Sequence, residues 1–345
     1  MYDCIIVGQG IAGTVLAYTF LKNQKTPFVI STDKLPSASQ VAGGIFNPLT
    51  GKNLVKTWLA DELFPFLHTF YRELEQVLGE KFLHSTPIYR PFRSIEEQNE
   101  WLAKSALQEF KPYLNTDVNE NQYCSDIKNP FGGVETLQAG WVELPKLLNS
   151  FHCFLKKKSL YFREIFDYSA LQIFSEKVAY KDIEAERIIF CEGTQAIHNP
   201  FFQNLPFNFA KGEMIDVWVE DASFESIVNQ GVSLIPLQEN TYRVASTYSW
   251  EGLDWEISEK ARTELIGKAR NLLKKDFRVI AQNAGVRPAT KNRRPIIGLH
   301  PQMPRVGIFN GLGSKGVSLA PYLADRFYKH IYENAPLPHE INQPA

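Results

Sequence analysis

The sequence predicts an α/β protein, with a Rossmann-type domain built on a parallel sheet and a second, mostly antiparallel α+β domain. Three observations predict this fold class. The chain opens on an apolar run at residues 2–7, three glycines spaced G-x-G-x-x-G and a helical pattern at 14–23. An apolar run, a glycine-rich loop and a helical pattern recur at 306–332. Between them, residues 211–247 alternate as antiparallel strands do.

The first glycine loop has the pattern of a dinucleotide-binding turn. Gly8 permits the sharp exit from the strand, Gly10 lets a pyrophosphate approach the backbone, and Gly13 lets the following helix pack closely on the sheet. The start of that helix, at Ile11 and Ala12, offers unpaired N–H groups and partial positive charge to the phosphates. Its place between strand and helix favours dinucleotide binding over the alternative, a glycine-rich turn without a ligand.

The second strand is expected at residues 26–30, and the end of such a strand normally offers a carboxylate to the adenosine ribose. Ser31 stands at that position, and the first carboxylate is Asp33. Either Asp33 reaches the ribose or Ser31 makes a weaker hydrogen bond. Because no arginine stands beside them, the missing carboxylate does not indicate NADP.

The composition is that of an ordinary globular protein without affinity for polyanions. The 345 residues suffice for two domains, and 44% hydrophobic with 22% charged residues is typical of soluble proteins. A net charge of -1 predicts no general attraction to nucleic acid or to an anionic membrane. Since residues 2–7 already form a core strand and no apolar run has membrane length, we expect a cytoplasmic protein without a signal peptide or membrane span.

Neither a disulfide nor a metal site is predicted. The four cysteines, Cys4, Cys124, Cys153 and Cys191, have no C-x-x-C spacing and are expected to be buried free thiols. The seven histidines form no pair with metal-ligand spacing.

The middle of the chain adds elements of both kinds. Small residues at 37–48 are expected to run close against a flat ligand, and the apolar strand 187–194, which ends at a glycine, is expected to return to the parallel sheet. Helices are expected at 57–79, 95–102, 144–154 and 258–273, and strands at 88–92, 160–173, 211–219, 232–237 and 241–247, with a hairpin turn at 238–240.

The C-terminal part repeats the strand, glycine loop and helix. Residues 285–290 are Gly-Val-Arg-Pro-Ala-Thr, 295–298 are Pro-Ile-Ile-Gly, and 311–316 are Gly-Leu-Gly-Ser-Lys-Gly, followed by a predicted helix at 317–332. A second helix N-terminus therefore points at an electron-rich ligand. A nicotinamide has no evident need of it, whereas a reduced flavin is an anion across N1 and C2=O that such a helix end can stabilise.

These residues resemble the D-amino acid oxidase family of FAD-dependent oxidoreductases, and the C-terminal motifs are most similar to its glycine oxidase branch. The loop 311–316 and Lys211-Gly212 are also similar to the FAD domain of the bifunctional enzyme that modifies the wobble uridine of tRNA. Gly-x-Arg-Pro-x-Thr with Pro-x-Ile-Gly after it is the most specific part. We expect a discontinuous FAD-binding domain at 1–55, 140–205 and 285–345, and a substrate domain at 56–139 and 206–284.

The resemblance implies a non-covalent FAD site, because the stretch 287–316 holds no cysteine and only one histidine, His300. The pyrophosphate would lie at the first loop, and the flavin against the small residues after the second strand and against the last loop. The positions implied in this sequence are Gly8, Gly10, Ile11, Ala12, Gly13, Ser31, Asp33, Ser39, Ala42, Gly43, Gly44, Gly193, Gly311, Gly313, Ser314, Lys315 and Gly316.

Arg287 matches the arginine that binds the substrate carboxylate in this family. A planar guanidinium suits that role because two parallel N–H bonds fix the acid; the alternative is a structural arginine paired with a core carboxylate. Ser233 stands where glycine oxidases have a substrate-binding tyrosine, and Ser314 replaces an arginine, leaving Lys315 as the nearby cation. Arg287, Lys315 and Ser233 form the expected catalytic set, and the departures argue against glycine itself as the substrate.

The resemblance implies an enzyme that oxidises an amino acid or secondary amine by hydride transfer to flavin N5, giving an imine that water hydrolyses. Oxygen or another acceptor would reoxidise the flavin. Two alternatives stay open, an oxidase-like enzyme acting on the tRNA wobble-uridine side chain and a non-catalytic flavin-binding protein. The neutral net charge weighs against the first, because tRNA binding normally requires a basic surface.

Overall fold

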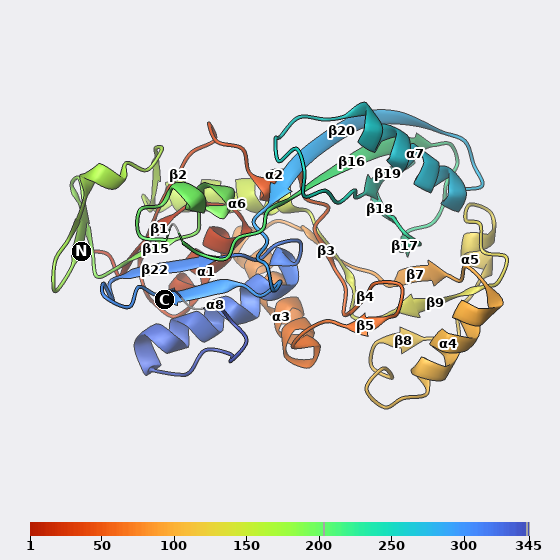
Figure 1. The fold of residues 1–345 in the computed structure, drawn as a ribbon, viewed down its shortest axis with the longest axis horizontal. Coiled ribbons are helices and arrows are strands. Elements are labelled where there is room, and N and C mark those ends of the chain that lie inside the picture. The colour runs from red at the N-terminus through yellow and green to blue at the C-terminus, as the bar shows by residue number, and fades with distance from the viewer. Residues whose placement is uncertain (203, 343, 345) are drawn as a thin grey trace.

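A six-stranded sheet organises one half of the molecule in this computed structural model, which describes residues 1–202, 204–342 and 344 (Figure 1). Its strand order is β11-β2-β1-β15-β22-β21, and each neighbouring pair is parallel except β21 with β22. The strands are β1 (Cys4–Val7), β2 (Pro27–Ser31), β11 (Tyr161–Arg163), β15 (Ile188–Phe190), β21 (Ile296–Leu299) and β22 (Val306–Asn310).

Both faces of this sheet are buried, which explains why β1 is apolar throughout. Cys4 and Ile6 pack into a core formed with the helices, whereas Ile5 and Val7 pack into a second core on the opposite face. The helical layer contains α1 (Ile11–Lys22), α3 (Ala60–Leu78), α6 (Leu144–Lys157) and α8 (Gly316–Glu333). The other face is covered by a sheet of β12 (Leu171–Ile173), β13 (Val178–Tyr180) and β14 (Ile183–Ala185), with the short helices η1 (Tyr168–Ala170) and η2 (Gly193–His198) nearby.

An eight-stranded sheet of order β20-β16-β19-β18-β17-β7-β9-β8 forms the other half, and only β17 and β7 pair in parallel. Helix α7 (Glu259–Leu272) packs on it through Leu265 and Leu272. The strands are β7 (Ile88–Pro91), β8 (Leu114–Asn115), β9 (Gly133–Thr136), β16 (Ala210–Val219), β17 (Ile227–Asn229), β18 (Ser233–Gln238), β19 (Thr241–Ala245) and β20 (Phe277–Arg287).

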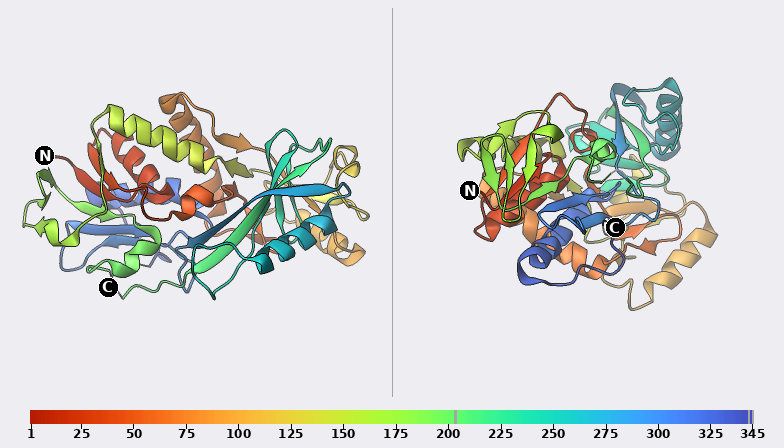
Figure 2. Two further views of the ribbon diagram at one scale, coloured as in Figure 1. Left: turned by 90° about the horizontal axis from the view of Figure 1, so that it is seen from above. Right: turned by 60° about the vertical axis from the view of Figure 1, so that its left-hand side comes forward.

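Short elements join the two halves. A small sheet of β3 (Ile45–Phe46), β10 (Gly140–Val142) and β6 (Leu83–Ser85) and the hairpin of β4 (Leu49–Thr50) and β5 (Val55–Lys56) lie between the sheets (Figure 1). Helix α2 (Ala38–Val41) lies against β20, while α4 (Ile95–Ser105) and α5 (Asn121–Cys124) lie at the far end. The long strands β16 and β20 extend from the junction into the second half (Figure 2).

The predicted fold class is confirmed, and most predicted elements lie within a few residues of the observed ones. The hairpin between β18 and β19 is also confirmed. The length of β20 was not predicted, and the expected domain boundary between residues 284 and 285 falls inside this strand. The expectation that all cysteines are buried is wrong for Cys124 and Cys153, although all four are free thiols.

None of the described helices is long and apolar enough to cross a membrane. No group of three His, Cys, Asp or Glu side chains in the described ranges is arranged to hold a metal ion.

Candidate functional site

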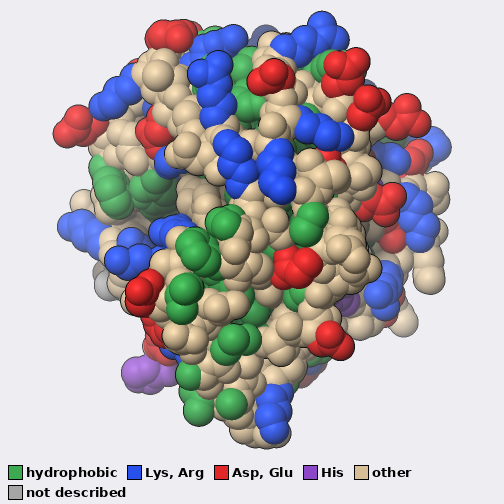
Figure 3. All heavy atoms as spheres, turned by 90° about the vertical axis from the view of Figure 1, so that its right-hand side faces the viewer, with side chains coloured by type: hydrophobic (Ala, Val, Ile, Leu, Met, Phe, Trp, Pro, Cys, Tyr) green, Lys and Arg blue, Asp and Glu red, His purple; other side chains and the backbone are tan. Residues whose placement is uncertain are grey.

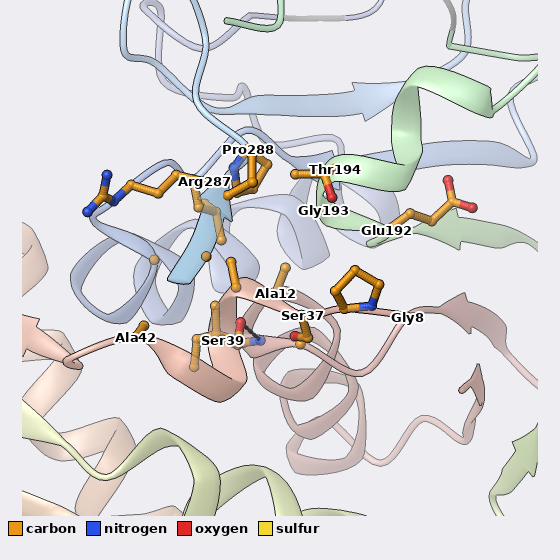
Figure 4. Close-up of a pocket in the computed structure, with 18 of the residues that line it drawn as sticks. Gly8, Ala12, Ser37, Ser39, Ala42, Glu192, Gly193, Thr194, Arg287 and Pro288 are labelled. Carbon is orange, nitrogen blue, oxygen red and sulfur yellow. Dashed lines mark hydrogen bonds between the residues drawn. The ribbon is translucent and has the colours of Figure 1, made fainter. Parts of the chain in front are cut away.

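A cavity of about 550 Å³ lies at the junction of the two sheets. Its wall is formed by the first glycine loop, helix α2, the segment after β15, the end of β20 and the start of α8 (Figure 4). Of the residues expected at a cofactor, those that line it are Gly8, Gly10, Ile11, Ala12, Ser31, Ser39, Ala42, Gly43, Gly44, Gly193, Gly313, Ser314 and Gly316. Sequence positions more than 300 residues apart therefore meet at one cavity.

The first glycine loop is shaped by close backbone contacts. Gly8 has φ +101°, and a Cβ there would lie 2.4 Å from the carbonyl oxygen of Cys191. A Cβ on Gly13 would lie 1.9 Å from the carbonyl oxygen of Gly8, so Gly13 permits close packing of α1 without itself lining the cavity. At Gly10 the wall is open, and the nearest atom to an added Cβ is Ser39 Oγ at 3.1 Å. Only a residue without a side chain leaves this part of the cavity empty.

Polar groups from neighbouring segments hold the loop. The backbone N–H of Ile11 donates to Ser39 Oγ at 3.0 Å, and the N–H of Gln9 donates to Ser31 Oγ at 3.1 Å. Asp33 is not on the cavity wall, and its carboxylate pairs with Arg163 at 3.0 Å on the surface. Of the two candidates for the ribose, Ser31 lines the cavity and Asp33 does not.

Glu192 is a wall residue that the sequence reasoning missed. It lies two residues after the end of β15, and its two carboxylate oxygens accept hydrogen bonds from the hydroxyl of Tyr168 at 2.5 Å and the side-chain amide of Asn199 at 2.7 Å. Burial raises the pKa of Glu192 to about 7, because its neighbours are neutral donors that offset only part of the desolvation. A carboxylate at the end of an apolar strand, next to Gly193, was the available signal.

Arg287 ends β20 at the opposite end of the cavity, and its side chain extends along the wall (Figure 4). Its Nη1 donates to the carbonyl of Lys211 at 3.2 Å, and its Nη2 donates to Ser246 Oγ at 2.7 Å and to the carbonyl of Thr247 at 3.3 Å. The guanidinium carbon lies 5.0 Å from the centre of the Tyr248 ring. No carboxylate of the described chain lies within ion-pairing distance of it.

This environment leaves a partly buried cation without an anion among the described residues. Burial lowers the pKa of Arg287, yet an arginine keeps its charge in a protein. Its five N–H groups make three hydrogen bonds with described residues, all to neutral oxygens. The alternative of a structural arginine paired with a core carboxylate finds no partner within the described ranges.

The other residues of the expected catalytic set lie in different surroundings. Ser233 lines the cavity, and its hydroxyl accepts a hydrogen bond from Asn229 at 2.8 Å. Lys315 is not on the wall, since its ammonium donates to Thr57 Oγ1 at 3.2 Å behind the loop. Burial, with the nearby Arg294 and Arg293, lowers the pKa of Lys315. Gly311 also lies behind the wall, with φ +72°.

Few aromatic side chains line the cavity. Tyr242 is buried in the core against Phe224, with ring centres 4.2 Å apart, while Tyr248 and Trp250 are about half exposed. None of the three lines the cavity itself. Tyr248 reaches the site only through Arg287.

The cavity fits a dinucleotide cofactor. A glycine loop and the start of helix α1 form one part of its wall, and small side chains leave the space along α2 free. The start of a second long helix, α8, joins the wall at Gly316 and Val317. The fold and the site thus define a protein of the dinucleotide-binding class.

Comparison with known proteins makes the class specific. The family model DAO, described as FAD dependent oxidoreductase, matches residues 3–328, so the chain belongs to this family and FAD is its cofactor. The glycine oxidase of Bacillus subtilis (strain 168) is 23% identical over 347 residues, which cover 93% of this chain and 90% of that protein.

Solved structures agree on the fold. The iminodiacetate oxidase of Chelativorans sp. BNC1 superposes with a TM-score of 0.81 at 17% identity, covering 99% of this chain and 100% of that one. The glycine oxidase of Bacillus cereus superposes with a TM-score of 0.79 at 18% identity, covering 97% and 96%. The family model over residues 3–328 confirms the expected family, the FAD cofactor and the oxidoreductase class.

Proposed function

We propose that this oxidoreductase acts on an amino acid or a secondary amine that carries a carboxylate, and oxidises it at the carbon bearing nitrogen. The observation that carries the proposal is the partly buried guanidinium of Arg287 on the cavity wall, without an anionic partner in the described chain. A carboxylate would supply the missing negative charge and accept bidentate hydrogen bonds. The names of the similar proteins, a glycine oxidase and an iminodiacetate oxidase, support an amine of this kind.

The protein's own contribution is binding and orientation. FAD, when bound, supplies the hydride acceptor at N5, so no strong acid or base is required of the chain. Arg287 would fix the carboxylate and thereby orient the neighbouring C–H bond. The substrate loses a hydride from carbon and a proton from nitrogen and becomes an imine. Water then converts the imine to a carbonyl compound and a free amine or ammonia.

The residues around Arg287 give the substrate end of the cavity its character. Met214, Ala245 and Ser246 line the wall beside it, together with Ser233. Ser233 offers a small hydroxyl where a tyrosine was expected from the glycine oxidases, which leaves room for a substrate larger than glycine. We therefore favour a substituted amino acid or an N-substituted amine over glycine.

Neither the net charge nor the face drawn in Figure 3 supports a nucleic-acid substrate. The face at the far end of the eight-stranded sheet carries Lys and Arg side chains interspersed with Asp and Glu (Figure 3). The net charge of the chain is -1. A tRNA substrate would be favoured by a continuous basic surface, so we propose a small-molecule substrate and keep the electron acceptor open between oxygen and another oxidant.

An anaerobic titration tests the proposal. Purified yellow protein is titrated with glycine, sarcosine, proline and D-amino acids, and bleaching of the flavin absorbance identifies the substrate. For the substrate found, Arg287→Ala should leave the flavin content unchanged and weaken apparent affinity by about 2–5 kcal/mol, the scale of a truncated charged hydrogen-bond pair. Arg278→Ala, on the solvent-exposed part of β20, is the matched control. Unchanged kinetics in Arg287→Ala would remove this residue from the site.

A further inference from the structure

The side chain of Arg287 crosses a neighbouring strand. Arg287 lies on β20 and pairs with Ala210 of β16, and β16 pairs on its other edge with β19. The guanidinium donates to Ser246 and Thr247, which directly follow β19. To reach them from β20 it must pass over β16.

Gly212 is the residue over which it passes. A Cβ built on Gly212 would lie 2.0 Å from Nη2, 2.4 Å from Cζ and 2.5 Å from Nη1 of Arg287. Cβ atoms in real structures do not approach other atoms so closely. The guanidinium cannot simply move aside, because three hydrogen bonds hold it in place. Gly212 does not have positive φ, so its backbone would accept any residue. The three atoms nearest to such a Cβ all belong to the guanidinium, so the position of Arg287 requires that residue 212 has no side chain.

The ring of Tyr248 closes the other side of this passage. It lies over the guanidinium at 5.0 Å. The segment that carries Tyr248 is fixed to β16, because Lys211 and Ser249 exchange backbone hydrogen bonds of 2.8 and 3.0 Å. The Lys211 ammonium also pairs with Asp254 further along the same segment. Backbone at Gly212 and ring at Tyr248 thus form the two walls of a slot.

We propose that Gly212 is the specificity-determining residue of the site, because the slot it forms with Tyr248 holds the Arg287 guanidinium where a substrate carboxylate can bind. The inference rests on the proposed function of Arg287 as the carboxylate anchor. Gly212 itself lines the cavity, and in this role it acts by positioning Arg287. A larger residue at 212 displaces the cation and removes the preference for acidic amines without removing the cofactor.

Ligand binding to the FAD-loaded enzyme tests the slot. Sodium acetate, with acetamide as its uncharged counterpart, is titrated while the flavin absorbance is followed. In Gly212→Ala we expect the dissociation constant for acetate to rise at least about tenfold, on the scale of a misplacement of about 1 Å, with that for acetamide and the flavin content unchanged. In turnover, KM for the substrate should rise more than kcat falls. Gly267→Ala, on α7 with no atom near its Cβ, is the matched control.

A double-variant cycle separates this inference from the proposed function. If Arg287→Ala does not reduce the preference for acetate over acetamide, the proposed carboxylate anchor fails. If Arg287→Ala reduces it but Gly212→Ala does not, only the slot fails. In Arg287→Ala/Gly212→Ala the added methyl enters vacated space, so the second change should have no further effect. If Gly212→Ala alone does not fold but the double variant does, the slot is supported. If neither variant folds, or if the effects of the two substitutions on acetate binding add, the slot is refuted.

Discussion

Replacing Glu192 by glutamine should change how the stability of the holoenzyme depends on pH. The carboxylate accepts hydrogen bonds from Tyr168 and Asn199, and burial raises its pKa from the ordinary value of 4.5 to about 7. In the unfolded chain the side chain of Glu192 ionises near pH 4.5, whereas in the folded protein it keeps its proton up to about pH 7. Its stabilising contribution is therefore fully present below pH 4.5, declines as pH rises, and is lost by about pH 7.

The size of this effect follows from the two pKa values. The interval from 4.5 to about 7 corresponds to about 3 kcal/mol of unfolding free energy. Glu192→Gln keeps the shape of the protonated acid, with one acceptor oxygen and one donor group, but does not ionise. The difference in unfolding free energy between the variant and the parent should thus grow in favour of the variant by up to about 3 kcal/mol from pH 4.5 to pH 7.5. Urea unfolding at several pH values, with FAD in fixed excess because bound ligand adds stability, measures it.

Two further variants sharpen the measurement. Glu176→Gln replaces a carboxylate whose side chain is 89% exposed and should leave the pH profile of the parent unchanged. Tyr168→Phe removes a hydrogen bond that lowers the pKa of Glu192, so its titration should move to higher pH. Parallel pH profiles of the parent and Glu192→Gln would refute the reasoning, since the carboxylate would then ionise alike in both states.

The remaining predictions concern the nucleotide end of the cavity. Asp33→Ala should retain FAD as the parent does and lower the free energy of unfolding by at most about 1 kcal/mol, because the exposed pair with Arg163 is screened by solvent. Loss of flavin on gel filtration would instead indicate that Asp33 binds the ribose. Gly10→Val should fold yet lose FAD, since its branched side chain enters the cavity where Ser39 Oγ lies 3.1 Å from the first carbon. The flavin-to-protein absorbance ratio after purification checks it, and a yellow protein would contradict it.

The parts of the fold that the sequence predicted are encoded locally. The first strand, the glycine turn and α1 lie within residues 4–22, and each has a short-range pattern of its own. The length of β20 was not predicted because β20 is an edge strand, and among the described residues its one partner strand is β16. Its first half mixes exposed and half-buried residues, so neither a continuous apolar run nor a clean alternation marks it.

The site was predicted less completely because its contacts are remote along the chain. Arg287 donates to groups 40, 41 and 76 positions away, and no local pattern reports such distances. The resemblance found the arginine, but only the folded chain shows what surrounds it. Glu192 was hidden for a related reason: its donors Tyr168 and Asn199 stand 24 and 7 positions away.

The two ionisable groups at the ends of the cavity respond to burial in opposite ways. Glu192 has neutral partners and relieves the cost of burial by holding a proton up to about pH 7. Arg287 also has neutral partners, but a guanidinium cannot give up its proton in this range. Its desolvation cost therefore persists in the folded protein until an anion arrives. A carboxylate that binds there would offset a cost already incurred, which is why the proposed substrate end lies at Arg287 and not at Glu192.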